Sequence, residues 1–533
     1  MQYIGESSVN LPQDMNLVPK AAAPASRSKK VNVIPLSGST FNPGDVAKFE
    51  IPVGGSTPTF MDGSQTYLLF QVQNTDNTAW IVDGSCASFI QKLEVYSSSQ
   101  LIETINEYGT LYQIFNDTQK AFSDRQAADS ILLGTDYDGS DSYNFSRGGL
   151  SVAANAKATF ALPIVSGVIG SSCNKMLPLH MLTDLRLEIT WANSPVAVVS
   201  STSTAVSTNI WKVTFVELAV QCLYLDHEVN GMLMSAHGND PIQISTEMYR
   251  NYNTVLSGSS ADSTILPLKF TSTKSLLAIY RSTGNLNNYA QSWVTSRKNP
   301  FASAGASLPN VQLLAGQNYV PQIPLRSVQE IYAEYNKCFH ALGNIHNKTT
   351  MNKLTYDYPV DILPYTASTI TISGITTAGV ASFSGTIPAI TTGMAFQFAT
   401  LGNTGAGLVV GTTYYFFPVA GSTTTFNIAS SYQNAIAGTA ITIATAYTNN
   451  STIAANTTTY FQQIPSFVLG FNLDSLYQSS QTSMSGTNTQ AGNVFLNSTS
   501  YSATPVATRL DAYAHYDAIL VIDPVSKSMS IRI

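Results

Sequence analysis

One long part of the chain lacks charge. Between Ile362 and Leu473 there is no Asp, Glu, Lys, Arg or His, although 11% of all residues are charged, which would place about a dozen charges in such a window. Ser, Thr, Asn and Gly interrupt every apolar stretch, so the window is not a membrane span, which needs about 18 consecutive apolar residues. Its alternating runs at 410–418 and 424–429 carry the β-branched and aromatic residues that disordered linkers lack. We therefore predict an uncharged, inserted β module at 362–462.

The sequence also lacks closely spaced cysteine pairs and the pattern of a secretory leader. The N-terminus has neither a basic start nor an apolar core, so we do not expect a secretory signal. Free, buried thiols in a reducing cytosol are the favoured state, although long-range disulfides stay open. A net charge of −6 gives no general attraction to nucleic acid. The four cysteines show no C-x-x-C spacing; they are Cys86, Cys173, Cys222 and Cys338.

Motifs for catalysis and metal binding are absent from the sequence. There is no G-x-S-x-G, H-E-x-x-H or G-x-x-x-x-G-K-[ST]. Asp136, Asp138 and Asp141 resemble a calcium loop, but Arg147 stands where its glutamate is expected, which favours an ordinary solvated loop. We predict that the chain is not an enzyme and has no catalytic, cofactor-binding or metal-binding residues.

Three weaker signals have plain structural interpretations. His227-Glu228 and His237 lie near the middle of the chain, where packing at a hinge or interface is favoured over metal binding. Cys338 and His340 lie two apart on a predicted helix, so they do not share a face. Asn-X-Ser/Thr sequons matter only on a secretory route; they begin at Asn347, Asn450, Asn456 and Asn497.

The residues that are abundant favour β structure. The chain has 27 Tyr, 23 Phe, 34 Gly and 23 Pro, and its length can bury two or three cores. Residues 1–30 contain three prolines and a basic cluster, and we predict a flexible arm there. The first half then shows strand-like runs near 47–53, 68–72, 89–96, 158–166, 183–192 and 210–224, with an amphipathic helix starting near Tyr108.

The second half repeats this order. Strand-like runs lie near 241–248, 264–270, 275–281, 466–472 and 510–523. An amphipathic helix is predicted from Ser327 to Gly343, with a capping box of Ser327 and Glu330 and an apolar stripe that includes Leu342. We deduce two similar β-sandwiches, each with a helix in a long loop, and the uncharged module in the second of these loops.

Several segments resemble the double-jelly-roll major capsid proteins of double-stranded DNA viruses, a family that includes those of virophages, polinton-like viruses, adenoviruses and tectiviruses. The matching segments are 89–96, 101–105, 107–112, 176–180, 184–191 and 512–522. The uncharged module is similar to a small β module of phage and viral fibre proteins, at 391–398, 408–415 and 425–428. The resemblance implies two tandem jelly-roll β-sandwiches with short helices in long loops. Their expected bounds are 31–235 for the first, 236–361 with 463–533 for the second, and 362–462 for the inserted module.

The resemblance also implies a function. Such chains form homotrimers, pseudo-hexagonal capsomers that contact neighbouring capsomers and minor capsid or penton proteins in an icosahedral virion assembled in the host cytoplasm or nucleus. It places the inserted module on the outer surface, towards a host receptor, and the arm towards an inner protein, membrane or DNA. Two other functions stay open: a carbohydrate-binding or adhesive surface protein, favoured by the Thr/Ser/Asn-rich module, and a glycan-active enzyme, which would need a convergent pair of carboxylates.

Overall fold

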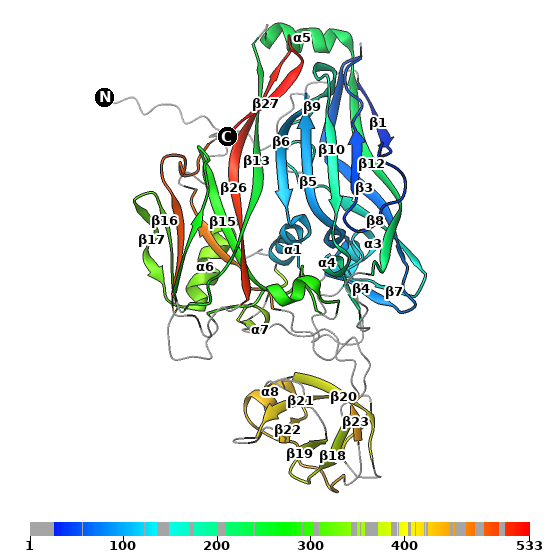
Figure 1. The fold of residues 1–533 in the computed structure, drawn as a ribbon, viewed down its shortest axis with the longest axis vertical. Helices are drawn as coiled ribbons and strands as arrows, with labels where there is room; N and C mark the ends of the chain where they lie inside the picture. The colour runs from blue at the N-terminus through cyan, green and yellow to red at the C-terminus, as the bar shows by residue number, and fades with distance from the viewer. Residues whose placement is uncertain are drawn as a thin grey trace, which may run out of the picture.

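The fold was obtained as a computed structural model (Figure 1). It describes residues 26–533 with gaps at 56, 122–123, 136–148, 171–174, 201–207, 238–239, 260, 290, 302–308, 343–348, 352, 358–370, 385–391, 393, 403–406, 411, 420–421, 423–424, 448–450, 454–464, 475–483, 500 and 502–506.

The first half forms two facing antiparallel sheets. One has the order β1 (Ser26–Val33), β12 (Trp211–Leu225), β3 (Thr59–Asn74) and β8 (Lys157–Pro163), with β9 (Leu177–Pro178) also paired to β3. The other has the order β2 (Val46–Glu50), β10 (Arg186–Trp191), β5 (Ile90–Ser97) and β6 (Gln100–Asn106). A small sheet of β11 (Val198–Ser200), β4 (Trp80–Val82) and β7 (Ser151–Val152) closes one end.

The second half builds the same pair of sheets. One has the order β13 (Ile242–Val255), β26 (Thr508–Asp523), β15 (Thr273–Ser282) and β24 (Leu469–Asn472), with β27 (Ser528–Arg532) also paired to β26. The other has the order β14 (Ala261–Leu266), β25 (Val494–Thr499), β16 (Asn310–Ala315) and β17 (Asn318–Leu325).

Strand order identifies both halves as jelly rolls. In each half the first strand pairs with the last, the last with the third and the third with the strand that follows the long helix-bearing loop. The other four strands make the second sheet, also in matching order. Eight strands in two such sheets define the jelly roll. The predicted fold class, mainly β with two tandem jelly rolls, is confirmed.

Helices α1 (Tyr108–Gln119) and α6 (Val328–Cys338) occupy equivalent loops, each between the fifth and sixth strands of its jelly roll. The Ser327 hydroxyl accepts from the Glu330 amide at 3.1 Å, which confirms the predicted N-terminal cap. The predicted C-terminus at Gly343 is wrong, because α6 ends at Cys338 and His340 adopts the left-handed conformation. Leu342, expected on the apolar stripe, is 54% exposed because it lies beyond the helix.

A third unit lies in the loop after α6. Its six strands close into a barrel in the order β18 (Thr371–Ile375), β19 (Val380–Ser384), β22 (Thr425–Ala429), β21 (Thr413–Pro418), β20 (Met394–Thr400) and β23 (Ser451–Ile453). The barrel has its own aromatic core, which includes Phe396, Phe416 and Tyr447, and α8 (Tyr432–Ile436) packs outside it. The barrel strands lie within 362–462, and Figure 1 shows the barrel at the end of the molecule opposite helix α5 (His227–His237).

The N-terminal boundary differs from the prediction. Residues 26–30 were expected in a flexible arm, but they belong to β1, which pairs with β12 from Ser26↔Leu225 to Val33↔Leu218. Arg27 lies over the Tyr224 ring and Lys30 over the Tyr67 ring, so cation–π contacts hold part of the predicted basic cluster on the sheet. Residues 1–25 lie outside the described residues.

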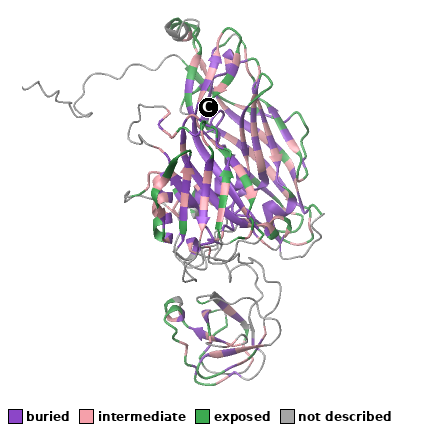
Figure 2. Cartoon of the chain, turned by 60° about the vertical axis from the view of Figure 1, so that its left-hand side comes forward, coloured by how far each residue is buried: buried purple, intermediate pink, exposed green. Residues whose placement is uncertain are grey.

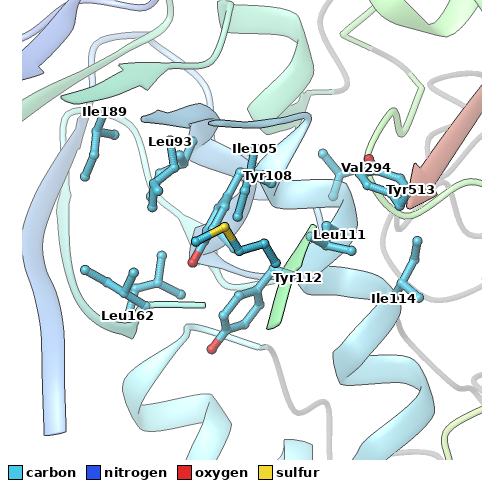
Figure 3. Packing of buried hydrophobic residues seen from close by; sticks show 14 of the residues in the cluster. Leu93, Ile105, Tyr108, Leu111, Tyr112, Ile114, Leu162, Ile189, Val294 and Tyr513 are labelled. Carbon is cyan, nitrogen blue, oxygen red and sulfur yellow. The ribbon is translucent and has the colours of Figure 1, made fainter. Parts of the chain in front are cut away.

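One continuous hydrophobic core runs through both jelly rolls. Figure 2 shows buried residues along the strands of both, and separately inside the barrel. Figure 3 shows how the two halves share the core: Tyr108 and Leu111 of α1 lie among residues of the first jelly roll, with Val294 and Tyr513 of the second beside them. The jelly rolls therefore meet through α1.

Candidate functional site: the junction between the jelly rolls

Buried charges gather where the two jelly rolls meet. Glu107 precedes α1, and its carboxylate reaches two arginines of the second jelly roll: Arg281 Nη2 at 3.1 Å and Arg509 Nη2 at 3.0 Å. Both arginines also pair with Asp511 on β26, each at 2.7 Å. The Trp293 indole donates to Glu107 at 3.1 Å, and the Arg281 guanidinium lies 3.9 Å from its ring centroid. Every charge in this group of four has an opposite partner.

Backbone geometry aims Glu107 at the second jelly roll. Its φ of 51° is in the left-handed region, which costs a non-glycine residue about 1 kcal/mol or more. The Tyr513 hydroxyl donates to the Glu107 carbonyl at 3.1 Å. Burial by itself would raise the pKa of Glu107, but Arg281 and Arg509 outweigh it and hold this pKa below its ordinary value. Burial opposes the charge of Arg281 in the same way, and Asp511 and Glu107 nevertheless raise the pKa of the guanidinium.

A second ion pair crosses the junction about three helical turns further along. Asp117 of α1 pairs with Arg297, and both side chains are fully buried. Gln113 Nε2 donates to Asp117 Oδ1 at 3.0 Å, while the backbone amide of Thr350 donates to the Asp117 carbonyl at 2.9 Å. The C-terminal half of α1 is thus tied to two other segments of the chain, at Arg297 and at Thr350.

A third carboxylate enters a turn of the second jelly roll. Asp83 accepts the Ser292 and Thr295 hydroxyls at 2.6 Å each, and the backbone amides of Trp293 and Val294 at 2.8 and 2.6 Å. Burial raises the pKa of Asp83, and these four hydrogen bonds oppose the rise only in part. The turn of residues 292–295 thus surrounds the Asp83 carboxylate, and we call this contact the Asp83 socket.

The inserted barrel is attached at the same place. The chain enters the loop after α7 (Lys353–Tyr356) and returns at Ser466, and these ends are joined because the Ser466 amide donates to the Thr355 carbonyl at 2.8 Å. The Tyr356 hydroxyl donates to Val468 O at 2.7 Å. The Arg297 amide donates to Pro465 O at 2.8 Å, so the base of the insertion is bonded to the junction itself.

The candidates from sequence are not part of this junction. Asp136, Asp138, Asp141 and Arg147 lie outside the described residues, as do Asn347, Asn450, Asn456 and Cys173. His227 and Glu228 are exposed at the start of α5, and His237 ends that helix. Asn497 lies on β25, where the Ser263 hydroxyl donates to it at 2.7 Å. Within the described part of the chain, no His, Cys, Asp or Glu side chains are grouped as metal ligands.

The expectation for cysteine holds where it can be checked. Cys86, Cys222 and Cys338 are free and buried, and burial raises the thiol pKa of all three. Cys338 is the last residue of α6 and His340 follows the helix, which corrects their expected placement on one helix. None of the helices in the described ranges is long and apolar enough to span a membrane.

The junction residues were missed at the sequence level. Arg281 follows the apolar run Leu276–Tyr280, and Asp511 stands beside Leu510 in the closing strand, so charges next to apolar strand residues were the available signal. Their pairing could not be found that way, because Glu107 and Asp511 lie about 400 residues apart.

Three solved viral structures are similar to this chain over nearly its whole length. The structure of PBCV-1 VP54 fitted into a reconstruction of the virophage Sputnik has 12% identity and a TM-score of 0.48, with 97% of this chain and 98% of that chain covered. The cryo-EM structure of the Sputnik virophage has 10% identity, a TM-score of 0.48 and coverage of 99% and 93%. The mavirus major capsid protein has 9% identity, a TM-score of 0.41 and coverage of 99% and 96%.

No protein family model and no curated protein sequence matches this chain. The assignment of two jelly rolls therefore depends on the strand order of the chain itself.

Proposed function

We propose that this chain is the major capsid protein of a double-stranded DNA virus and has no enzymatic activity. The observation that carries the proposal is the junction: two jelly rolls of identical strand order are locked into one block by buried ion pairs, the Asp83 socket and a shared core. Shell subunits must keep a fixed shape to repeat the same contacts around a lattice. The resemblance of segments such as 89–96 and 512–522 to double-jelly-roll capsid proteins supports the same role.

The repeat within the chain supports a homotrimer. In the second jelly roll, residues 510–518 of β26 are all buried, so both faces of the strand are covered, one of them by α1 and its neighbours. The equivalent strand of the first jelly roll, β12, alternates between buried and half-buried residues, and Phe215 on it is 39% exposed. A second copy can cover this sheet as the first jelly roll covers the second. A contact between unlike surfaces closes into a ring when its rotation permits, and the resemblance to double-jelly-roll capsid proteins implies a ring of three copies.

The oligomeric state of the purified chain tests this role. We expect light scattering to give the mass of a trimer and negative-stain images to show a pseudo-hexagonal outline. Phe215→Glu should lower the trimer fraction by placing a charge in a closing contact, whereas Glu50→Gln, on the exposed side of the other sheet, should leave it unchanged. A monodisperse wild-type monomer would contradict the proposal.

The ends of the block provide its further contacts. The barrel stands at one end and α5 at the other, where β1 also begins beside Leu225 (Figure 1). We assign the barrel end to the outer surface, for host contact, and the end where β1 begins to the interior, and we propose that the N-terminal arm contacts a minor protein, membrane or DNA there. The first assignment is tested by measuring whether the isolated barrel binds host cells and whether it competes with infection by the virus. Sugar binding by a monomeric chain would instead favour an adhesive surface protein.

A further inference from the structure

Another acidic side chain at the junction, Glu103, forms no ion pair with the described residues. Glu103, on β6, is 2% exposed. Its Oε1 accepts the Gly167 amide at 2.9 Å, and its Oε2 accepts the Ser166 hydroxyl. In the described ranges no Lys, Arg or His pairs with Glu103, unlike Glu107 with its two arginines. Glu103 is therefore a buried carboxyl whose ionisation no opposite charge compensates.

Glu103 holds a loop from the side of the first jelly roll. Residues 164–170 follow β8 and are buried except for Val165, which is half-buried. The Ser166 hydroxyl oxygen accepts the amides of Val168 at 3.1 Å and Ile169 at 3.2 Å, which closes a turn. The Tyr108 hydroxyl accepts the Val165 amide at 2.9 Å. The loop is thus fixed by one carboxyl group and two hydroxyls.

The other side of this loop meets the second jelly roll. The Thr246 hydroxyl of β13 donates to the Gly167 carbonyl at 2.6 Å. A Cβ atom on Gly167 would lie 2.6 Å from both Glu247 O and Met248 Cγ, so the loop backbone is in direct contact with β13. Gly167 consequently touches Glu103 through its amide and the second jelly roll through its carbonyl.

The groups around Glu103 leave its charge unbalanced. The loop 164–170 has no ionisable side chain, and β5 places Val95 opposite Glu103. Tyr108 of α1 and Tyr516 of β26 face it, and burial followed by the nearby Glu103 charge contributes to the raised pKa of both hydroxyls. The charged side chains of β13 have other partners: Glu247 pairs with Lys274 at 2.6 Å and His515 at 3.0 Å, and Arg250 stacks on Tyr252.

We infer that Glu103 is a pH-sensitive latch between the two jelly rolls: its neutral carboxyl keeps the loop 164–170 closed on β13, and its ionisation loosens this part of the junction. A charged carboxylate in a dry site without a cation draws in water. The nearest way to admit water is to open the loop, which would separate β6 from β13 while the arginine pairs around Glu107 keep the jelly rolls attached.

The direction of the effect follows from the ionisation equilibrium. Burial raises the pKa of Glu103 from 4.5 to about 7, and the hydrogen bonds from Gly167 and Ser166 lower it only in part. Because the folded value lies above the unfolded one, the contribution to stability is complete below about pH 4.5 and is lost as the pH rises through about 7. The equilibrium constant for opening of the loop should therefore rise by roughly 30-fold between about pH 5.5 and 8.5.

Amide hydrogen exchange tests the latch on the isolated full chain. We expect the protection of the Val168 and Ile169 amides, corrected for intrinsic rates and compared with amides of β26, to fall by roughly 30-fold from about pH 5.5 to 8.5. Glu103→Gln keeps the shape of the side chain but cannot ionise, so it should abolish the pH dependence of this protection. Glu50 is an exposed carboxylate of the same jelly roll, and Glu50→Gln should leave the pH dependence unchanged.

Two results would overturn the inference: a flat profile in the unmodified chain, or the same pH dependence in Glu103→Gln as in wild type. The wild-type profile is decisive by itself if the variant does not fold. The contact lies within one chain, so the result is independent of whether the chain forms trimers.

Discussion

Arg281 and Glu107 lie in different jelly rolls and form an ion pair of 3.1 Å in which the arginine side chain is fully buried. Glu107 also accepts from Arg509, and Arg281 also donates to Asp511. A buried pair of this kind adds little net stability, because the cost of desolvation offsets the attraction. Removing one member is nevertheless strongly destabilising, because it leaves a buried charge without a partner. The group therefore specifies how the jelly rolls are oriented.

Removing Arg281 tests this destabilisation. We expect Arg281→Met to lower the free energy of unfolding by about 3–5 kcal/mol, because it leaves the buried carboxylates of Glu107 and Asp511 with Arg509 alone. Denaturant unfolding measures the change. Lys48→Met is the matched control: its pair with Glu188 is long, at 3.6 Å, and the Lys48 side chain is exposed, so the substitution should change stability by less than about 1 kcal/mol. Equal effects of the two variants would contradict the role of the buried group.

The turn beside Asp83 provides a test of close packing. Gly84 has a φ of +87°, and a Cβ atom there would clash with the Thr295 methyl and lie 2.7 Å from Gln113 Oε1. Gly55 has a similar φ of +93° but nothing within 4 Å of such an atom. Gly84→Ala should therefore be more destabilising than Gly55→Ala by about 1–3 kcal/mol in thermal or denaturant unfolding, since only the first adds overpacking to strain. Similar losses would show that the socket has room to adjust.

Removal of the barrel tests its independence. Replacing residues 362–462 by a short Gly-Ser linker should leave a folded chain with the same oligomeric state, because Thr355 and Ser466 already join the ends of the loop and the barrel has a separate core. Circular dichroism and light scattering measure the outcome. Thr355→Val with Ser466→Ala in the full chain provides the comparison, since it removes their side-chain hydrogen bond of 3.0 Å and keeps the barrel. An unfolded product after the deletion would show that the barrel contributes to the jelly-roll core.

The Arg297 side chain predicts an internal water molecule. Its Nε and Nη1 atoms are buried without a hydrogen-bond partner among the described residues, as are Gln113 Oε1 and Asn116 Nδ2 on the same face of α1. Buried donors of this kind are almost always satisfied by ordered water. Because Asp117 already neutralises Arg297, we expect water and not an anion. A cryo-EM map at about 2 Å resolution should show density within about 3.2 Å of Arg297 Nε or Nη1. Its absence, in a map that shows other buried waters, would contradict this.

Local patterns predicted much of the secondary structure. The alternation at 68–72 and 89–96 gave β3 and β5, and the cap of Ser327 and Glu330 located the start of α6. The end of that helix was missed because His340, and not a glycine, adopts the left-handed conformation after it. The first strand was missed because β1 is almost entirely exposed, so it has no alternating apolar pattern and is stabilised by pairing with β12.

The sequence by itself determined the class of this protein: alternating apolar strands in two matching halves, and one uncharged stretch within the second half, follow from residue order because side-chain periodicity and composition are local. Only the tertiary structure decided the site. Glu107, Arg281 and Asp511 come together from distant parts of the chain, and Glu103 is left without a cation, because burial and charge pairing depend on contacts between segments that no local pattern records.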